Sequence, residues 1–269
     1  MTHTRLPALF VSHGGGPWPY IDPMRKAFAR TVAEFTRLPQ RLASRPKAVL
    51  MVTAHWETED FSVSTGERPP MLYDYSGFPA HTYQIQYPAP GSPTVAARVQ
   101  ELLKDAGMAC REDSRRGFDH GTFVPLGLMF PEADVPVVML SIQASYDPVE
   151  HLRVGRALAP LRDEGVLLVG SGLTYHNMRG FGRPESTLVA SQFEHYLNQA
   201  INNPDPVARD EALTHWDRAP GARLAHPQED HLMPLLVVAG AAGSDVGRRI
   251  LVDHVMDVAM ASYHFGELR

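Results

Sequence analysis

Four short apolar runs limit the folds that are open to this chain. They are rich in aliphatic side chains and cover residues 7–11, 48–53, 135–140 and 166–170. Continuous apolar runs of this length are typical of strands buried on both faces of a parallel sheet. We therefore predict four buried strands at these positions.

Helical patterns lie between and after these strands. Ser92-Pro93 and Asp147-Pro148 each resemble a helix N-cap followed by proline at the first helical position. Strands that alternate with helices predict one α/β sandwich domain over residues 1–269, with a largely parallel or mixed central sheet. The predicted helices cover residues 23–38, 92–106, 147–161, 191–202 and 232–242, and the predicted irregular stretches cover 69–93, as an ordered loop beside the site, and 204–223.

The composition excludes several classes of protein. The net charge is −5 and the Lys and Arg residues are scattered, so we do not expect nucleic acid as a partner. The single cysteine, Cys110, excludes a disulfide framework and a thiolate cluster, so any metal must be held by nitrogen and oxygen ligands. No apolar stretch approaches the roughly 20 residues of a membrane span. Residues 1–11 do not resemble a signal peptide, and we expect a cytoplasmic protein.

Three of the 13 histidines follow predicted strands. His13 follows the first strand, His55 the second, and His176 the fourth. In parallel α/β sheets, ligands bind at the carboxyl ends of the strands. The glycines at 14–16 let the backbone turn sharply beside His13, but they match neither a P-loop nor a dinucleotide-binding pattern. Each imidazole alone has an ordinary structural explanation, and their common position predicts a histidine-rich site.

Two further histidines lie beside turn or helix-start signals. His120 follows Asp119 between two glycines, which predicts a tight turn, and its ordinary pKa suits proton transfer. His231 directly precedes the helix predicted at 232–242. Glu229 and Asp230 before it are ordinary partners of a helix N-terminus, and the segment is not the H-E-x-x-H motif of zinc proteases.

Other residues are candidates for supporting roles at the site or for purely structural roles. Histidine ligands usually need an acceptor on the second ring nitrogen, for which Asp119 and Asn177 are candidates. Arginine side chains could receive a substrate carboxylate, with solvated surface as the alternative, and the aromatic residues of the 69–93 loop could line a pocket or simply pack. The arginines are Arg115, Arg116 and Arg179; the aromatics are Tyr73, Tyr75, Phe78 and Tyr83; and the histidines expected mainly in surface or packing roles are His3, His81, His151, His195, His215, His254 and His264.

Seven segments in the same order resemble a known family over nearly the whole chain. They include LFVSHGGGP at 9–17, GFDHG at 117–121 and EDHLMPL at 229–235; the others lie at 54–56, 77–79, 87–93 and 171–177. The sequence resembles the class III extradiol ring-cleavage dioxygenases of the protocatechuate 4,5-dioxygenase β-subunit type, and is most similar to the 4,5-DOPA extradiol dioxygenase branch. The resemblance implies an α/β/α sandwich.

The resemblance also implies a metal site at His13, His55 and His231, with His176 close enough to bind the metal or exchange protons. It implies acid/base roles for His120 and His176. Fe(II) is the expected metal for activity, and zinc can occupy such nitrogen sites. The sequence leaves open whether Glu229 or Asp230 joins the ligand set.

The activity that this resemblance implies is extradiol cleavage of a catechol-type ring, DOPA or a related compound, by O₂. A monomer and a homo-oligomer are both compatible with the sequence. Two alternatives remain. Four neutral imidazoles also suit a zinc-dependent hydrolase on the same scaffold, and a non-catalytic metal- or catechol-binding protein would bind the ring without turnover.

Overall fold

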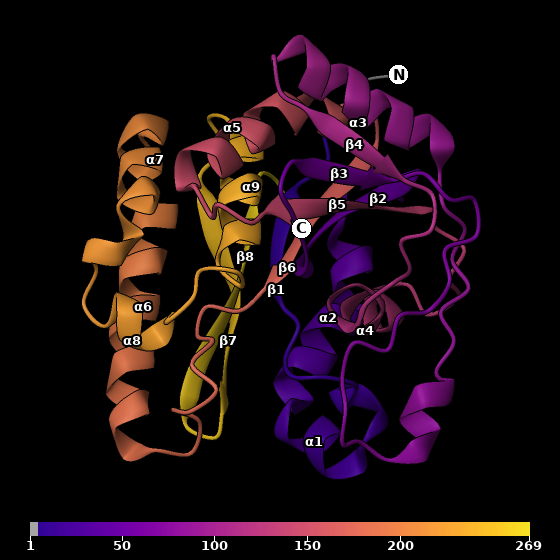
Figure 1. Ribbon diagram of the computed structural model, residues 1–269. Helices are drawn as coiled ribbons and strands as arrows, with labels where there is room; N and C mark the ends of the chain where they lie inside the picture. Colours follow the sequence, from indigo (N-terminus) through magenta and orange to yellow (C-terminus); the bar gives the residue numbers. More distant parts are fainter. Residues whose placement is uncertain (1–4) are drawn as a thin grey trace.

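The computed structural model describes residues 5–269, so that His3 lies outside the described residues. Its centre is an eight-stranded sheet in the order β4-β3-β5-β2-β6-β1-β8-β7 (Figure 1). The strands are β1 (Ala8–Ser12), β2 (Ala48–Thr58), β3 (Phe61–Ser64), β4 (Cys110–Asp113), β5 (Val137–Gln143), β6 (Val166–Gly172), β7 (Gly247–Val255) and β8 (Val258–Phe265).

The four strands predicted from apolar runs form the parallel centre of this sheet. β2 pairs in parallel with β5 and β6, and β6 pairs in parallel with β1. The other four strands were not predicted. They extend the sheet at its two sides, where β8 runs antiparallel to β1 and β3 runs antiparallel to β5. The prediction of an α/β fold with a largely parallel or mixed sheet is confirmed.

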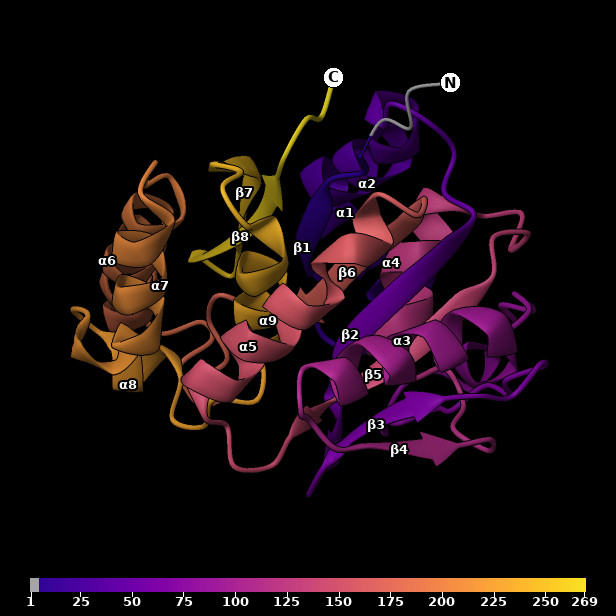
Figure 2. The same ribbon diagram turned by 90° about the horizontal axis from the view of Figure 1, so that it is seen from above.

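Helices cover both faces of the sheet. Helices α1, α2 and α4 lie on one face and α3, α5 and α9 on the other, while α6, α7 and α8 lie beside the β7–β8 end (Figure 2). Their bounds are α1 (Asp22–Ala27), α2 (Ala29–Arg41), α3 (Pro93–Asp105), α4 (His120–Met129), α5 (Pro148–Leu158), α6 (Pro184–Ile201), α7 (Pro206–Thr214), α8 (Ala222–Ala225) and α9 (Met233–Ala242).

Helix α9 is apolar along its whole length because it is enclosed by other elements. Every one of its ten residues is buried, and it packs against α5 and against strands β1, β2 and β6. Within residues 5–269, no helix has both the length and the apolar character that crossing a membrane requires.

The structure corrects three of the helix boundaries. The helix predicted at 23–38 is divided at Phe28 into α1 and α2. The one predicted at 147–161 ends at Leu158 and continues as a 3₁₀ turn, Ala159–Arg162. The one predicted at 191–202 starts earlier, because α6 begins at Pro184.

The two stretches predicted to be irregular differ in outcome. The 69–93 stretch has little regular structure apart from a 3₁₀ turn, Ala80–Gln84, as predicted. The prediction for 204–223 is wrong, because α7, a 3₁₀ turn and the start of α8 occupy most of it. The sequence signal that was missed is Asp205-Pro206, an N-cap residue followed by proline. The Asp205 carboxylate accepts a hydrogen bond of 2.9 Å from the Val207 backbone N–H and caps α7.

Candidate metal centre and active site

Five histidines from five separate segments meet at the carboxyl end of the central strands. His13 follows β1, His55 lies in β2, His120 starts α4, His176 follows β6, and His231 precedes α9. The ring centroids of His13, His55 and His231 form a nearly equilateral triangle with sides of 4.9, 4.9 and 5.2 Å. The structure thus brings together every histidine that the sequence predicted for the site.

An irregularity in β2 positions His55. β2 does not end before His55, as predicted, but continues to Thr58. Its pairing with β5 is interrupted between Val52 and Glu57, so His55 lies within the irregular part of the strand. Such interruptions bend a strand and re-aim its side chains, and they are common next to active sites.

A close approach between β6 and the start of α9 positions His231. The Leu173 backbone N–H donates to the His231 carbonyl at 3.0 Å. A Cβ atom at Gly172 would lie 2.1 Å from the same carbonyl oxygen. Glycine is therefore required at residue 172 for the segment that carries His231 to reach the sheet.

His120 is not on a tight turn, which corrects the sequence prediction. It is the first residue of α4, and Asp119 is the N-cap whose carboxylate accepts a hydrogen bond of 3.0 Å from the Thr122 backbone N–H. Asp119 also accepts a bond of 2.6 Å from Arg116 Nη2. Burial raises the pKa of Asp119, and the Arg116 guanidinium opposes that rise. Within residues 5–269 no hydrogen bond joins Asp119 to an imidazole ring, so Asp119 is not the ring acceptor for which it was a candidate.

Two acceptors fix the tautomers of His13 and His231. The Ser171 hydroxyl donates to the Gly121 carbonyl, so its oxygen accepts from His13 Nδ1 at 3.0 Å. The Asp230 carboxylate accepts from His231 Nδ1 at 2.6 Å. When Nδ1 carries the proton, the Nε2 lone pair of a neutral imidazole is free to bind a metal.

Asp74, like Ser171, is a site residue that the sequence analysis missed. Its carboxylate oxygens each lie 2.9 Å from His120 Nδ1, and one accepts a further bond of 2.9 Å from the His120 backbone N–H. The other oxygen is 3.3 Å from His55 Nδ1. Burial acts to raise the pKa of Asp74, but the contacts with His120 and His55 outweigh it and lower the pKa to about 2. Asp74 is therefore an anion that orients two imidazoles.

The donor atoms fit a divalent cation. His13 Nε2 and His55 Nε2 are 3.1 Å apart, and both present lone pairs when their Nδ1 atoms carry protons. Burial is the largest cause that lowers the pKa of His13, and it lowers those of His55 and His231 to about 3. These imidazoles are neutral near pH 7, as metal binding requires. A cation between them would relieve the repulsion of the facing lone pairs.

Among residues 5–269, two groups of possible metal ligands are compact enough to hold an ion. In the first, the donor atoms of His13, His55 and His120 lie within 4.8 Å of one another, and in the second the same holds for His176, Asp230 and His231. The rings of His176 and His231 are stacked with centroids 3.4 Å apart. Asp230 has one oxygen on His231 and the other 3.5 Å from His176 Nδ1. Although burial acts to raise it, these two histidines lower the pKa of Asp230.

The remaining candidates lie outside the ring of imidazoles. Glu229 forms an ion pair with Arg223, and the Asn177 side chain donates to the Leu224 carbonyl at 2.8 Å. The Asn177 Oδ1 accepts from the Arg179 backbone N–H at 3.1 Å, so Asn177 is not the ring acceptor for which it was a candidate. Trp56 is buried beneath the Arg116 guanidinium at 5.1 Å, and His81 hydrogen-bonds to the Tyr20 carbonyl at 2.9 Å.

Beside the imidazoles lies an apolar cavity of about 460 Å³, within the range of small-molecule sites. His55, His120, His176 and His231 form part of its wall, and of the four loop aromatics named as candidates only Phe78 lines it. Tyr73 and Tyr75 instead donate to the carbonyls of other loop residues.

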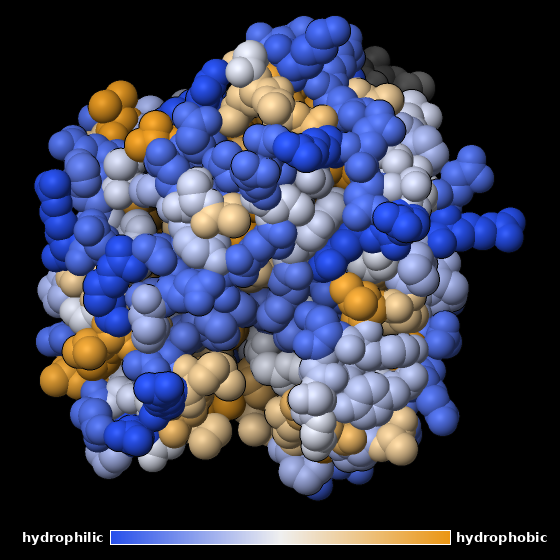
Figure 3. Space-filling view, viewed as in Figure 1, coloured by the Kyte–Doolittle hydropathy of each residue, from blue (hydrophilic) through white to orange (hydrophobic). Residues whose placement is uncertain are grey.

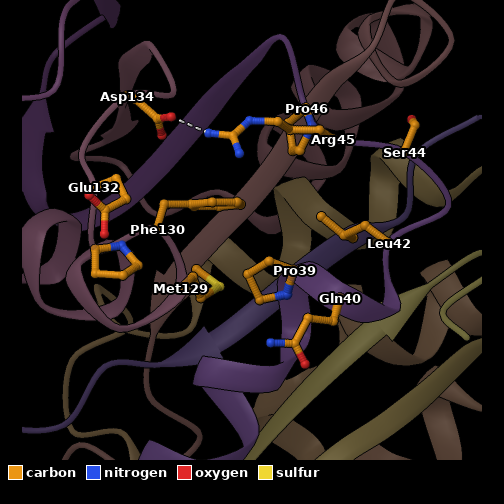
Figure 4. Close-up of a pocket in the computed structure, with 11 residues that line it drawn as sticks. Pro39, Gln40, Leu42, Ser44, Arg45, Pro46, Met129, Phe130, Glu132 and Asp134 are labelled. Carbon is orange, nitrogen blue, oxygen red and sulfur yellow. Dashed lines mark hydrogen bonds and ion pairs between the residues drawn. The ribbon is translucent and has the colours of Figure 1, made fainter.

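A second hollow lies elsewhere (Figure 4). It is lined by residues that include Pro39, Leu42 and Phe130 together with the Arg45–Asp134 ion pair. These residues immediately precede β2 and β5 in the chain, so this hollow is at the amino ends of the strands. It contains no member of either ligand group in the part of the chain that the structure describes.

Several histidines are buried in the neutral form, which predicts acid sensitivity of the metal-free protein. Burial lowers the pKa of His151 to about 4 and that of His226 to about 3. Between these values and the unfolded value of about 6.5, the unfolded chain binds more protons, so stability falls as the pH falls. From pH 6.5 to 5, each such histidine is expected to remove about 2 kcal/mol.

Thermal unfolding of the metal-free protein at pH 7.5 and pH 5.0 measures this effect. His226 lies against Phe193 and Trp216, and the matched variant is His226→Leu. Its loss of stability between the two pH values is expected to be smaller by the contribution of one histidine. Equal losses in the two proteins would contradict the assignment of His226 as a buried neutral base.

The fold and the site together define the class: an α/β protein whose neutral histidines form a candidate metal site beside an apolar cavity. Residues 7–266 match the family model described as the catalytic LigB subunit of aromatic ring-opening dioxygenase. The chain belongs to this LigB family of class III extradiol dioxygenases, whose members are non-haem metal enzymes that open aromatic rings.

Named relatives and a solved structure agree with this family. The chain is 40% identical over 259 residues to a 4,5-DOPA dioxygenase extradiol of Beta vulgaris, covering 94% of this chain and 93% of the relative. It is 38% identical over 278 residues to dioxygenase tasH of Hapsidospora irregularis, with 97% and 85% covered. The crystal structure of the uncharacterized protein JW3007 from Escherichia coli K12 superposes with a TM-score of 0.77 at 33% identity, covering 97% of this chain and all of that one.

Proposed function

We propose that this protein, as one catalytic domain over residues 1–269, uses Fe(II) held by His13, His55 and His231 to cleave a catechol ring with O₂. The observation that carries the proposal is the triangle of neutral imidazoles, two of which, His55 and His231, form part of the wall of an apolar cavity. Three protein ligands leave open positions on a hexacoordinate ion for two catechol oxygens and O₂. The product would be a hydroxymuconic-semialdehyde-type compound that contains both oxygen atoms.

His231 is preferred to His120 as the third ligand because of what each Nδ1 contacts. His231 Nδ1 donates to Asp230 alone, as a ligand with one orienting partner does. His120 Nδ1 lies against both oxygens of Asp74, and the same carboxylate accepts from the His120 backbone N–H as a second restraint. This arrangement suits a residue that is held in place to exchange protons next to a metal ligand.

Bound Fe(II) would bring the two reactants together and pass electron density from the ring to O₂. The chain's own residues supply the proton transfers. His176 and His120 both reach the cavity, and either ring can accept a proton from a catechol hydroxyl and return it to an oxygen of the opening ring. A positioned acid/base group of this kind contributes about 10²–10⁴-fold to the rate.

Anaerobic reconstitution tests the proposed function. The protein is loaded with Fe(II) or Zn²⁺, mixed with a panel of catechols, and exposed to air in an oxygen electrode. The Fe(II) protein is expected to consume one O₂ per catechol and to form a yellow product, whereas the zinc protein is expected to do neither. An Fe(II) protein that consumes no O₂ with any catechol of the panel would refute the proposal.

The carboxylate of Asp230 is expected to matter for metal affinity. Asp230→Ala removes the acceptor of His231 Nδ1, and loss of such a partner typically costs about 10–100-fold in metal affinity. The neighbouring change Glu229→Gln is the control, because Glu229 pairs with Arg223 and not with an imidazole. Fe(II) titration of both variants under anaerobic conditions gives the affinities. Equal Fe(II) affinities of the two variants would contradict a role of Asp230 in metal binding.

A further inference from the structure

Apart from its imidazoles, the wall of the active-site cavity is apolar. Apart from glycines and histidines, the residues that line the cavity are four methionines, three phenylalanines, one leucine and one valine. They come from α1 and the residue that follows it, the 69–93 loop, the segment after β6 and the β7–β8 hairpin. Figure 3 shows apolar atoms gathered at the lower margin of the molecule, around a notch between the ends of β7 and α1.

Charged side chains of the described residues do not line this cavity. Arg116 is paired with Asp119. It was one of the three arginines named above as candidates to bind a substrate carboxylate. Arg115 and Arg179 are exposed and are not part of the wall. The two nearby carboxylates, Asp74 and Asp230, are already bonded to imidazoles.

A charged substituent on the substrate would therefore lose its hydration without gaining a partner. Burying an unpaired carboxylate or ammonium group is strongly unfavourable, whereas an apolar group gains free energy by leaving water. The 4,5-DOPA dioxygenases among the relatives are named for a substrate that carries both an ammonium and a carboxylate group. The cavity of this chain offers neither group a counter-charge.

The backbone conformation at the rim of the cavity is a second observation that favours an apolar substrate. Met256 and Asp257 form the two-residue turn between β7 and β8, and their φ angles are 51° and 62°. Hairpin turns with two positive φ angles favour asparagine and glycine, and a methionine there is strained. The turn nevertheless places Met256 in the cavity wall, where the residue is 60% exposed.

We propose that the substrate is a catechol with an uncharged, apolar substituent, which packs between Met178, Phe181 and Met256. The proposal rests on the proposed dioxygenase function and names its substrate class. Met178 is 67% exposed at the rim, so an apolar substituent would cover side chains that otherwise face water. Methionine side chains adapt to different shapes, so the charge of the substituent, more than its shape, decides which catechols bind.

A pair of catechols whose two-carbon chains end in a methyl group or in a carboxylate tests the inference. The probes are 4-propylcatechol and 3-(3,4-dihydroxyphenyl)propionate, with DOPA as a third compound. The Fe(II) protein is expected to show a kcat/KM for propylcatechol at least tenfold above those for both charged compounds. A kcat/KM for either charged compound that equals or exceeds the value for propylcatechol would overturn the substrate class and leave the dioxygenase function standing.

Anaerobic binding of the same compounds separates the two proposals. If O₂ uptake were absent with every compound, the dioxygenase function would fail. Tighter binding of propylcatechol to the Fe(II) protein would still support an apolar ligand, and equal or tighter binding of the charged compounds would overturn it. O₂ uptake therefore tests the dioxygenase function, and anaerobic binding tests the substrate class separately.

A matched pair of variants tests whether the preference for an uncharged substituent arises from the cavity wall. Met178→Arg adds a cation at the rim and is expected to raise kcat/KM for the propionate relative to propylcatechol at least tenfold. Leu188→Arg adds the same charge at a residue of α6 that is 62% exposed and does not line the cavity. It should leave the ratio unchanged. An unchanged ratio in Met178→Arg, or an equal change in both variants, would contradict the proposal.

Discussion

The His231→Ala variant is expected to lose more than about 100-fold in Fe(II) affinity, because loss of a ligand's hydrogen-bond partner alone already costs about 10–100-fold. His231 contributes one corner of the triangle with His13 and His55. Its Nδ1 is occupied by Asp230, so its Nε2 is the atom that can bind the ion. Iron content after anaerobic loading and desalting measures the loss.

His120→Ala is the control for this experiment, because the donor atoms of His120, His13 and His55 also lie within 4.8 Å of one another. If His120 serves in proton transfer, its removal leaves one Fe(II) per chain. Unchanged circular dichroism in both variants shows that they are folded. The reverse pattern, with iron lost from His120→Ala and kept in His231→Ala, would assign the metal to His13, His55 and His120.

The second large effect concerns His176, whose replacement by alanine should slow turnover with iron still bound. Removal of a positioned acid/base group typically lowers kcat about 10²–10⁴-fold. The His176 ring lines the cavity and stacks on His231, so it can reach a proton on a bound catechol. We expect kcat to fall in this range, iron content to remain near one per chain, and anaerobic catechol binding to change much less.

His195→Ala is the matched control, because His195 is exposed on α6 and outside the cavity. It should retain full kcat. If His176→Ala lost its iron together with its activity, His176 would be a ligand, an alternative that the sequence left open. If it kept both iron and full kcat, the acid/base role would pass to His120.

The sequence predicted the centre of the fold because the central strands are buried on both faces and contain little but aliphatic residues. Their parallel order places all carboxyl ends at one edge, which is why His13 and His176, distant in the chain, could be predicted to meet. Two of the outer strands, β4 and β7, were not predicted for the opposite reason. β4 is partly exposed along its whole length, and β7 mixes charged and aliphatic residues without clear alternation.

The partners of the imidazoles could not be predicted in the same way. Asp74 lies in a loop with no periodic pattern, and Ser171 lies inside an apolar strand. Only the folded chain shows that these two side chains, and not Asp119 or Asn177, contact the rings. The charge of the cavity wall was equally hidden, because its residues come from four segments that are distant in the sequence.

The most direct test is a crystal structure of the Fe(II) protein with 4-propylcatechol, grown without oxygen and recorded at the iron absorption edge. We expect one anomalous peak in bonding contact with His13, His55 and His231, with both catechol oxygens on the same ion and the propyl group against Met178 and Met256. A peak bonded to His120 in place of His231, or a catechol bound away from the ion, would contradict the account.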